Sequence, residues 1–131
     1  MINKHFLEEP NLVDLSKEIY KAVVQDKLEI NTRFNLLSDD IYDAETINFI
    51  LADGLGYENL NSTDSYLNQN VTKSINTTFP SSTNVALSSI AFMKNPIEHG
   101  LIGYYMFDKS QYGLINCLLY TSDAADDHHR V

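Results

Sequence analysis

The chain has 131 residues, a formal net charge of −9 and a single cysteine. Its length predicts one domain or part of one, and its acidic balance argues against binding a nucleic-acid polymer through a basic surface. One cysteine excludes an internal disulfide framework, and no apolar run in the sequence is long enough to cross a membrane.

The first part of the chain, residues 1–45, is predicted to be a helical lead-in. It carries Glu8 and Glu9 and lacks the basic-then-apolar pattern of a secretory signal, so we expect a cytoplasmic protein. Asn11 can cap a helix whose first turn holds Asp14. Four apolar residues then recur at helical spacing: Leu12, Leu15, Ile19 and Val23. The following stretch, Lys27–Asp43, is ambiguous and is interpreted as a second helix broken near Ser38–Asp40.

The stretch Ile47–Gly56, which reads INFILADGLG, is central to the interpretation. A short apolar run that ends at turn residues is typical of a buried strand, which we place at Thr46–Ala52. Asp53 then lies at the carboxyl end of this strand, where open α/β sheets bind ligands. A carboxylate held there needs a positive partner, and a metal ion is the first candidate.

The rest of the chain alternates between the two kinds of secondary structure. Tyr57–Asn70 is interpreted as a helix anchored by Leu60 and Leu67. The remaining expectations are a strand at Val71–Phe79, a turn at Pro80–Ser82, a helix at Thr83–Phe92, a loop at Asn95–Gly100 and an extended segment at Leu101–Phe107. This order is the βαβ pattern, so residues 46–116 are predicted to form an α/β unit with a mostly parallel sheet flanked by helices.

Three features in this region carry chemistry: Asp53–Gly54, Thr83 after FPSS, and the string Pro96–Gly100 that contains His99. A helix that begins at Thr83 offers free N–H groups to a phosphate. A hydroxyl there can attack phosphorus if a metal lowers its pKa. Taken singly, each feature has a commoner explanation, namely a turn, a helix cap and a structural histidine.

Taken together, the run ILADGLG … TTFPSSTNVALSSIAFMKNPIEHGLIGY resembles the N-terminal part of the alkaline phosphatase superfamily. The most similar branch is the type I phosphodiesterase and nucleotide pyrophosphatase group, with the related phosphonoacetate hydrolases. The resemblance covers roughly residues 47–104. It implies the N-terminal part of an alkaline-phosphatase-like sandwich and an enzyme that hydrolyses a small-molecule phosphoester or pyrophosphate.

The resemblance also implies roles for particular residues. Asp53 matches a metal-binding aspartate, and Thr83 matches a nucleophile that also contacts a metal. The backbone N–H of Asn84 would hold a phosphoryl oxygen, and His99–Gly100 matches a motif that shapes the site without binding metal. Members of this group use two divalent metal ions, typically zinc.

Two positions depart from the pattern or complicate it. Met93 stands where the family usually has a glycine that closes the helix, so the turn there is expected to differ locally. Thr78 precedes Phe79–Pro80, and some relatives carry their nucleophile in a Thr–Phe–Pro string. The spacing to Pro96 and His99 favours Thr83 over Thr78.

The final segment, residues 117–131, does not fit the rest of the chain. Cys117–Asp126 matches one reading frame of a transposon-end sequencing adaptor without a break, so we interpret the segment as a non-native tail. Its cluster of acidic residues and histidines is therefore not interpreted as a metal site: Asp123, Asp126, Asp127, His128 and His129. The genuine chain is then an N-terminal fragment.

A fragment that ends near Asn116 lacks the later metal ligands of the family, since a closed zinc site needs three or four of them. We therefore expect the polypeptide to be inactive, marginally stable and prone to aggregate, although its parent is an enzyme. Two alternatives remain open: a non-catalytic homologue that binds a partner, and a phosphonoacetate-hydrolase or phosphomutase relative. The sequence does not indicate the oligomeric state.

Overall fold

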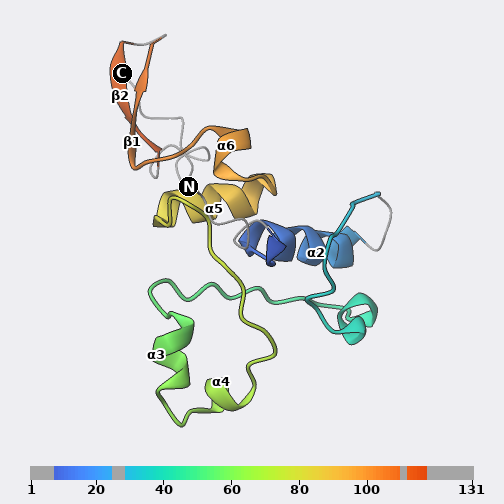
Figure 1. Cartoon of the computed structure of the whole chain (residues 1–131). Helices are drawn as coiled ribbons and strands as arrows, with labels where there is room; N and C mark the ends of the chain where they lie inside the picture. The colour runs from blue at the N-terminus through green and yellow to red at the C-terminus, as the bar shows by residue number, and fades with distance from the viewer. Residues whose placement is uncertain (1–7, 25–28, 110–111, 118–131) are drawn as a thin grey trace.

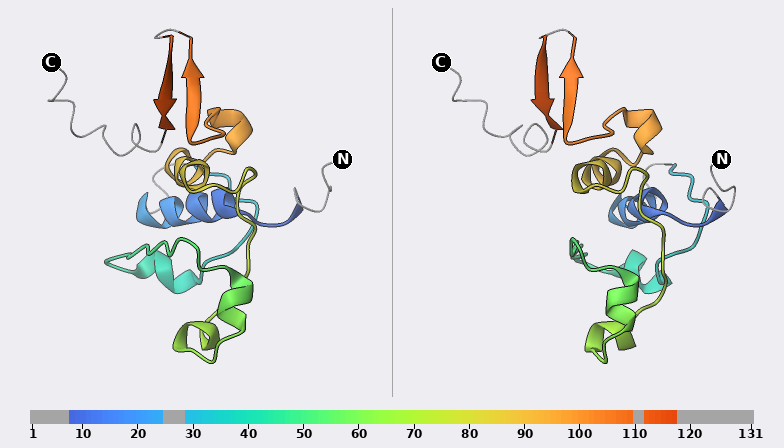
Figure 2. Two further views of the ribbon diagram at one scale, coloured as in Figure 1. Left: turned by 90° about the vertical axis from the view of Figure 1, so that its left-hand side faces the viewer. Right: turned by 60° about the vertical axis from the view of Figure 1, so that its left-hand side comes forward.

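The computed structural model describes residues 8–24, 29–109 and 112–117. Its centre is a layer of helices in which α5 (Thr83–Phe92) lies between α2 (Leu12–Val24) and the short α6 (Pro96–His99), as Figures 1 and 2 show. A hairpin of β1 (Tyr105–Asp108) and β2 (Gly113–Asn116) stands beyond α6. The chain between residues 39 and 69 adds three short helices: η1 (Asp39–Asp43), α3 (Tyr57–Asn61) and α4 (Tyr66–Gln69).

The first helix begins as predicted, because Asn11 caps it. The Asn11 side-chain oxygen accepts hydrogen bonds from the N–H groups of Val13, at 2.8 Å, and Asp14, at 3.2 Å. Asp14 in turn accepts a bond from the Asn11 N–H at 3.1 Å, so the two side chains satisfy the helix start reciprocally. The prediction of a helix here is confirmed.

The predicted apolar face of α2 is only partly right. Leu12, Leu15 and Ile19 are half-buried and Val23 is 58% exposed, whereas Asp14 and Glu18 are among the buried residues. The reason is that α2 has two neighbours. One side packs against α5, and the other receives the chain that follows the helix.

The predicted second helix over Lys27–Asp43 is wrong for the part that the structure describes. Residues 29–38 are irregular, and only η1 at the end of this stretch is helical. The carboxylate of Glu18 accepts the N–H groups of Leu36, at 2.7 Å, and Leu37, at 3.1 Å. These contacts to α2 replace the hydrogen bonds that a second helix would have made within itself.

The predicted parallel sheet is also wrong for the described residues. Thr46–Ala52 forms no regular secondary structure and pairs with no strand, and Val71–Phe79 contributes a single parallel bridge, between Asn11 and Asn76. A strand is stabilised only by a neighbour, and the described residues place none beside Thr46–Ala52. The sheet that does form is the antiparallel pair β1–β2, with Tyr105 opposite Asn116 and Asp108 opposite Gly113.

Two further predicted segments, Tyr57–Asn70 and Asn95–Gly100, differ from expectation because of short-range hydrogen bonds. The helix expected at Tyr57–Asn70 forms as two pieces, α3 and α4, with Ser65 capping the second through the N–H of Asn68. The loop expected at Asn95–Gly100 contains α6, where the N–H of Asn95 donates to Glu98 at 2.8 Å. Both changes follow from local capping.

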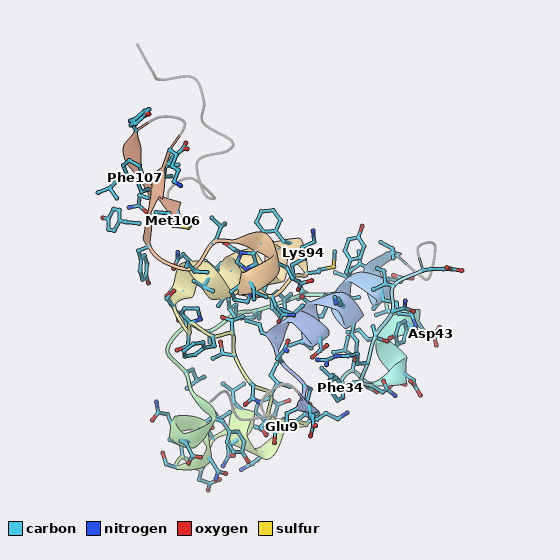
Figure 3. All side chains as sticks on the ribbon, turned by 45° about the horizontal axis from the view of Figure 1, so that its top comes forward. Glu9, Phe34, Asp43, Lys94, Met106 and Phe107 are labelled. Atoms are coloured by element: carbon cyan, nitrogen blue, oxygen red, sulfur yellow. The ribbon has the colours of Figure 1, made fainter. Side chains whose placement is uncertain are left out.

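The core is small and lies between α2 and α5. Val13 and Val85 are 1% and 0% exposed, and the polar side chains of Glu18, Asn84 and Ser89 are buried as completely. In contrast, the side chains of the β1–β2 hairpin, among them Met106 and Phe107, stand clear of the helices (Figure 3). Among the described residues, no helix has both the length and the apolarity that crossing a membrane requires.

Candidate functional site

The site is built on the first turn of α5, which has the bounds that the sequence predicts. Ser82 precedes the helix in an extended conformation, and its carbonyl accepts the first helical bond, from the N–H of Ala86 at 2.9 Å. The Ser82 side chain makes no capping bond to the helix. The N–H groups of the first turn are therefore not capped by Ser82, although two of the residues that carry them, Asn84 and Val85, are buried, at 1% and 0% exposure.

Asp53 and Thr83, the two residues that the sequence analysis selects, lie together. The Thr83 hydroxyl donates a hydrogen bond of 3.1 Å to a carboxylate oxygen of Asp53, although the two residues are 30 positions apart in the chain. Asp53 is exposed and Thr83 is half-buried, so the pair faces solvent. Gly54 follows with a φ of +76°, a conformation that favours glycine and turns the chain directly after Asp53.

The distance between the Thr83 hydroxyl oxygen and the Asp53 carboxylate oxygen is compatible with one cation bound by both. Two ligands are, however, too few for a closed metal site. Two oxygens that bind one zinc ion at about 2.1 Å in a tetrahedron lie roughly 3.4 Å apart, close to the observed 3.1 Å. A closed zinc site needs three or four protein ligands. Among the described residues, no group of three or more His, Cys, Asp or Glu side chains converges on one point.

Asn84 lies beside Thr83 but faces the protein interior. Its side chain is 1% exposed, donates to the carbonyl of Gly103 and accepts a bond of 2.8 Å from the Ser82 hydroxyl. Because the Asn84 side chain is held on both sides, the backbone of the first turn is fixed as well. The sequence analysis assigned a role only to the Asn84 backbone and missed this structural role of its side chain.

The structure separates the two candidate nucleophiles. The Thr78 side chain is buried, at 5% exposure, and its hydroxyl donates to the carbonyl of Pro80 at 3.1 Å. The Thr83 hydroxyl instead faces a carboxylate near the surface. A nucleophile must reach substrate and have a base or a metal beside it, and only Thr83 has both the access and the neighbour.

His99 lies at the other end of α5, away from Thr83. One ring nitrogen is 2.9 Å from the Ser89 hydroxyl, and the other accepts the N–H of Leu101 at 3.0 Å. Burial lowers the pKa of His99 and the charge of Glu98 raises it, with burial the larger effect. Both nitrogens therefore have protein partners, which leaves neither free to bind a metal.

The turn after α5 does not differ as expected, even though Met93 replaces glycine. Met93 adopts the left-handed conformation itself, with φ 53° and ψ 35°, and its N–H donates to the carbonyl of Ile90. A side chain in this conformation costs roughly 1–2 kcal/mol relative to glycine. The acidic and histidine-rich cluster at positions 123–129 lies outside the residues that the structure describes.

The sequence analysis also missed two buried carboxylates on α2. The Arg33 guanidinium donates to the Asp14 carboxylate at 2.8 Å, and this hydrogen bond raises the pKa of Arg33. Glu18 is 1% exposed and accepts two backbone N–H groups. Their spacing of four residues, which puts both on one helix face, was the available signal. Both carboxylates bind the segment that follows α2, through Arg33, Leu36 and Leu37.

Comparisons of the chain with protein-family models, with curated proteins and with solved structures gave no significant match.

Proposed function

We propose that this chain is part of a metal-dependent phosphohydrolase of the phosphodiesterase and nucleotide pyrophosphatase type, with Thr83 as its nucleophile. One observation carries the proposal: the Thr83 hydroxyl, at the start of α5, donates to the Asp53 carboxylate at 3.1 Å. A hydroxyl at a helix start with a carboxylate beside it supplies two of the parts that phosphoryl transfer to a side chain requires.

Each residue then has a defined task. Asp53 orients the Thr83 hydroxyl through the observed hydrogen bond and supplies one ligand oxygen to a divalent cation. The backbone N–H of Asn84 is the donor assigned to a phosphoryl oxygen; because Asn84 is 1% exposed, the first turn of α5 would have to open for a phosphate to reach it. When bound, a cation such as zinc would lower the pKa of the hydroxyl. The remaining ligands have to come from outside the described residues.

The main test uses a longer parent protein that contains these residues, with a small phosphodiester as substrate. Thr83→Val keeps the shape of the side chain and removes its hydroxyl, so hydrolysis should fall by roughly 10³-fold or more. The matched control, Thr83→Ser, keeps a hydroxyl and should retain measurable activity. If Thr83→Val left the rate unchanged, the chain would belong to a non-catalytic homologue or to an enzyme with another nucleophile.

A second test uses the 131-residue chain itself. With two ligand oxygens in contact and no converging group of three or more His, Cys, Asp or Glu side chains in the described ranges, it should not hydrolyse bis(p-nitrophenyl) phosphate in the presence of zinc. The background should carry His128→Ala and His129→Ala, so that these histidines add no metal binding of their own. Hydrolysis above that of a Thr83→Ala variant would show that the site is complete without further ligands.

A further inference from the structure

The corner between α5 and α6 fixes the position of the proton on the His99 ring. The N–H of Leu101 points at Nδ1 at a distance of 3.0 Å. Because a backbone N–H can only donate, Nδ1 must carry a lone pair, and the ring proton of the neutral histidine then lies on Nε2. His99 therefore donates to the Ser89 hydroxyl, 2.9 Å from Nε2.

This direction of donation excludes a serine–histidine catalytic pair. In such a pair the histidine accepts the proton of the serine hydroxyl, whereas here the Nε2–H group donates to that hydroxyl. Ser89 is also 0% exposed, so no substrate reaches it. The contact joins two segments of the chain, and the Phe92 ring, with its centroid 6.0 Å from that of His99, covers one side of it.

The segment that His99 holds leads back to the proposed nucleophile. Leu101 is bound to His99, and two residues later the carbonyl of Gly103 accepts a bond from the side chain of Asn84. Asn84 directly follows Thr83. The segment 101–103 is thus tied to α5 at Ser89 and again at Asn84, five residues or about 7.5 Å apart along the helix axis.

We infer that His99, as the neutral Nε2–H tautomer, is a positioning residue for Thr83. Its two hydrogen bonds fix the segment 101–103 against α5, and that segment fixes Asn84 and with it the first turn of the helix. His99 itself touches neither Thr83 nor Asp53. The inference rests on the proposed function of Thr83, but the coupling between His99 and Asn84 is a property of the fold.

The two hydrogen bonds of His99 that fix the segment 101–103 against α5, here called the His99 brace, are sensitive to acid. A second ring proton would lie on Nδ1, facing the Leu101 N–H, and two donors cannot bond to each other. Burial lowers the pKa of His99, and Glu98, the residue before it on α6, raises it by a smaller amount. The pKa of Glu98 is itself lowered, first by the hydrogen bonds from Asn95 and then by the charges of Lys17 on α2 and Lys94 in the turn after α5 (Figure 3).

The sign of the pH effect follows from this lowered pKa. An unfolded histidine has a pKa of about 6.5, so between the folded pKa and that value the unfolded chain binds more protons. The contribution of His99 to stability is complete above about pH 6.5. It decreases as the pH falls from there towards the lower folded pKa.

The test is NMR of the full chain with ¹⁵N-labelled histidine, with the His99 signals identified by their loss in His99→Asn. The expected spectrum near neutral pH shows a protonated Nε2 and an unprotonated Nδ1, and acidification should shift the Asn84 side-chain amide together with His99. Protonation on Nδ1 at neutral pH would overturn the inference. An Asn84 side-chain chemical shift that stays constant while His99 titrates would overturn it as well.

Two serines on α5 supply a matched pair of variants. Ser89→Ala removes the acceptor for His99 and should shift the Asn84 and Thr83 signals. Ser88→Ala removes a neighbouring buried hydroxyl for which the described part of the chain offers no hydrogen-bond partner, and it should shift them less. His99→Asn places an amide oxygen near the position of Nδ1, so it should shift the Asn84 and Thr83 signals less than His99→Ala does. Equal shifts for both serine variants would contradict the inference.

In an active parent protein, Ser89→Ala should lower kcat more than it changes KM, because it displaces Thr83 without removing a substrate contact. The two proposals can then fail separately. If the His99 and Asn84 signals respond together but Thr83→Val stays active, the proposed nucleophile is wrong and the role of His99 in fixing Asn84 is kept. If Thr83→Val is inactive but the two signals respond independently, the nucleophile is supported and the role of His99 is wrong.

Discussion

The helical layer of α2, α5 and α6 differs from the chain at residues 46–52. In the layer, polar groups find partners a few residues away or on the adjoining segment, as at Asn11 and Asn95. In the other region, apolar side chains lie in solvent, with Phe49 45%, Ile50 86% and Leu51 46% exposed. The comparison indicates that the layer is stabilised by its own contacts, whereas residues 46–52 are mostly exposed, with Phe49 lining an apolar cavity beside α2 and α5.

The largest expected loss of stability in the helical layer comes from substituting Glu18. Glu18→Ala leaves the N–H groups of Leu36 and Leu37 without their acceptor, and the buried environment of Glu18 denies the site easy access to water. We expect the free energy of unfolding to fall by about 2–4 kcal/mol. Urea denaturation followed by circular dichroism measures this change.

The control for that prediction is Glu18→Gln, which keeps an acceptor oxygen but loses the charge. It should cost about 1 kcal/mol, less than the alanine variant, because hydrogen bonds to a neutral acceptor are weaker. One carboxylate oxygen of Glu18 has no hydrogen-bond partner within the described ranges, so the glutamine amide gains no bond there. Equal destabilisation by both substitutions would mean that charge, and not hydrogen bonding, holds the chain to α2.

The sequence predicted well what depends on neighbouring residues. The bounds of α5, the Asn11 cap and the turn at Asp53–Gly54 follow from local propensity, capping and glycine conformation. The start of α5 and the turn at Asp53–Gly54 place the two site residues at the positions predicted, although the strand that was expected to carry Asp53 does not form. Their catalytic and metal-binding roles stay predictions.

What the sequence did not reveal depends on partners distant in the chain. Whether Thr46–Ala52 becomes a strand is decided by a neighbour that its own residues do not specify. The buried role of Glu18 likewise depends on amides 18 and 19 residues away. A charged residue on a helix is usually exposed, and although the spacing of Asp14 and Glu18 places both on one helix face, it does not indicate which distant amides pack there.

A smaller effect is expected from a substitution that stabilises the helical layer at Met93. Met93 closes α5 in the left-handed conformation, with φ 53°, which glycine adopts without steric cost. Met93→Gly should raise the free energy of unfolding by up to about 1 kcal/mol, the relief of strain exceeding the loss of a half-buried side chain. Thermal unfolding with Met93→Ala as the control separates the two terms, because alanine removes the side chain and keeps the strain. A glycine variant no more stable than the alanine variant would contradict this account.

The smallest expected effect lies in the exposed region. Ile50 is 86% exposed, so Ile50→Ser should change the free energy of unfolding by less than about 0.5 kcal/mol, whereas an isoleucine in a packed core costs several times more to truncate. The same substitution should slow aggregation, since an extended apolar segment without a partner strand is a template for pairing between chains. Light scattering measures aggregation and denaturation measures stability on the same samples. Marked destabilisation by Ile50→Ser would show that residues 46–52 are packed in solution, and the contrast between the two regions would then be lost.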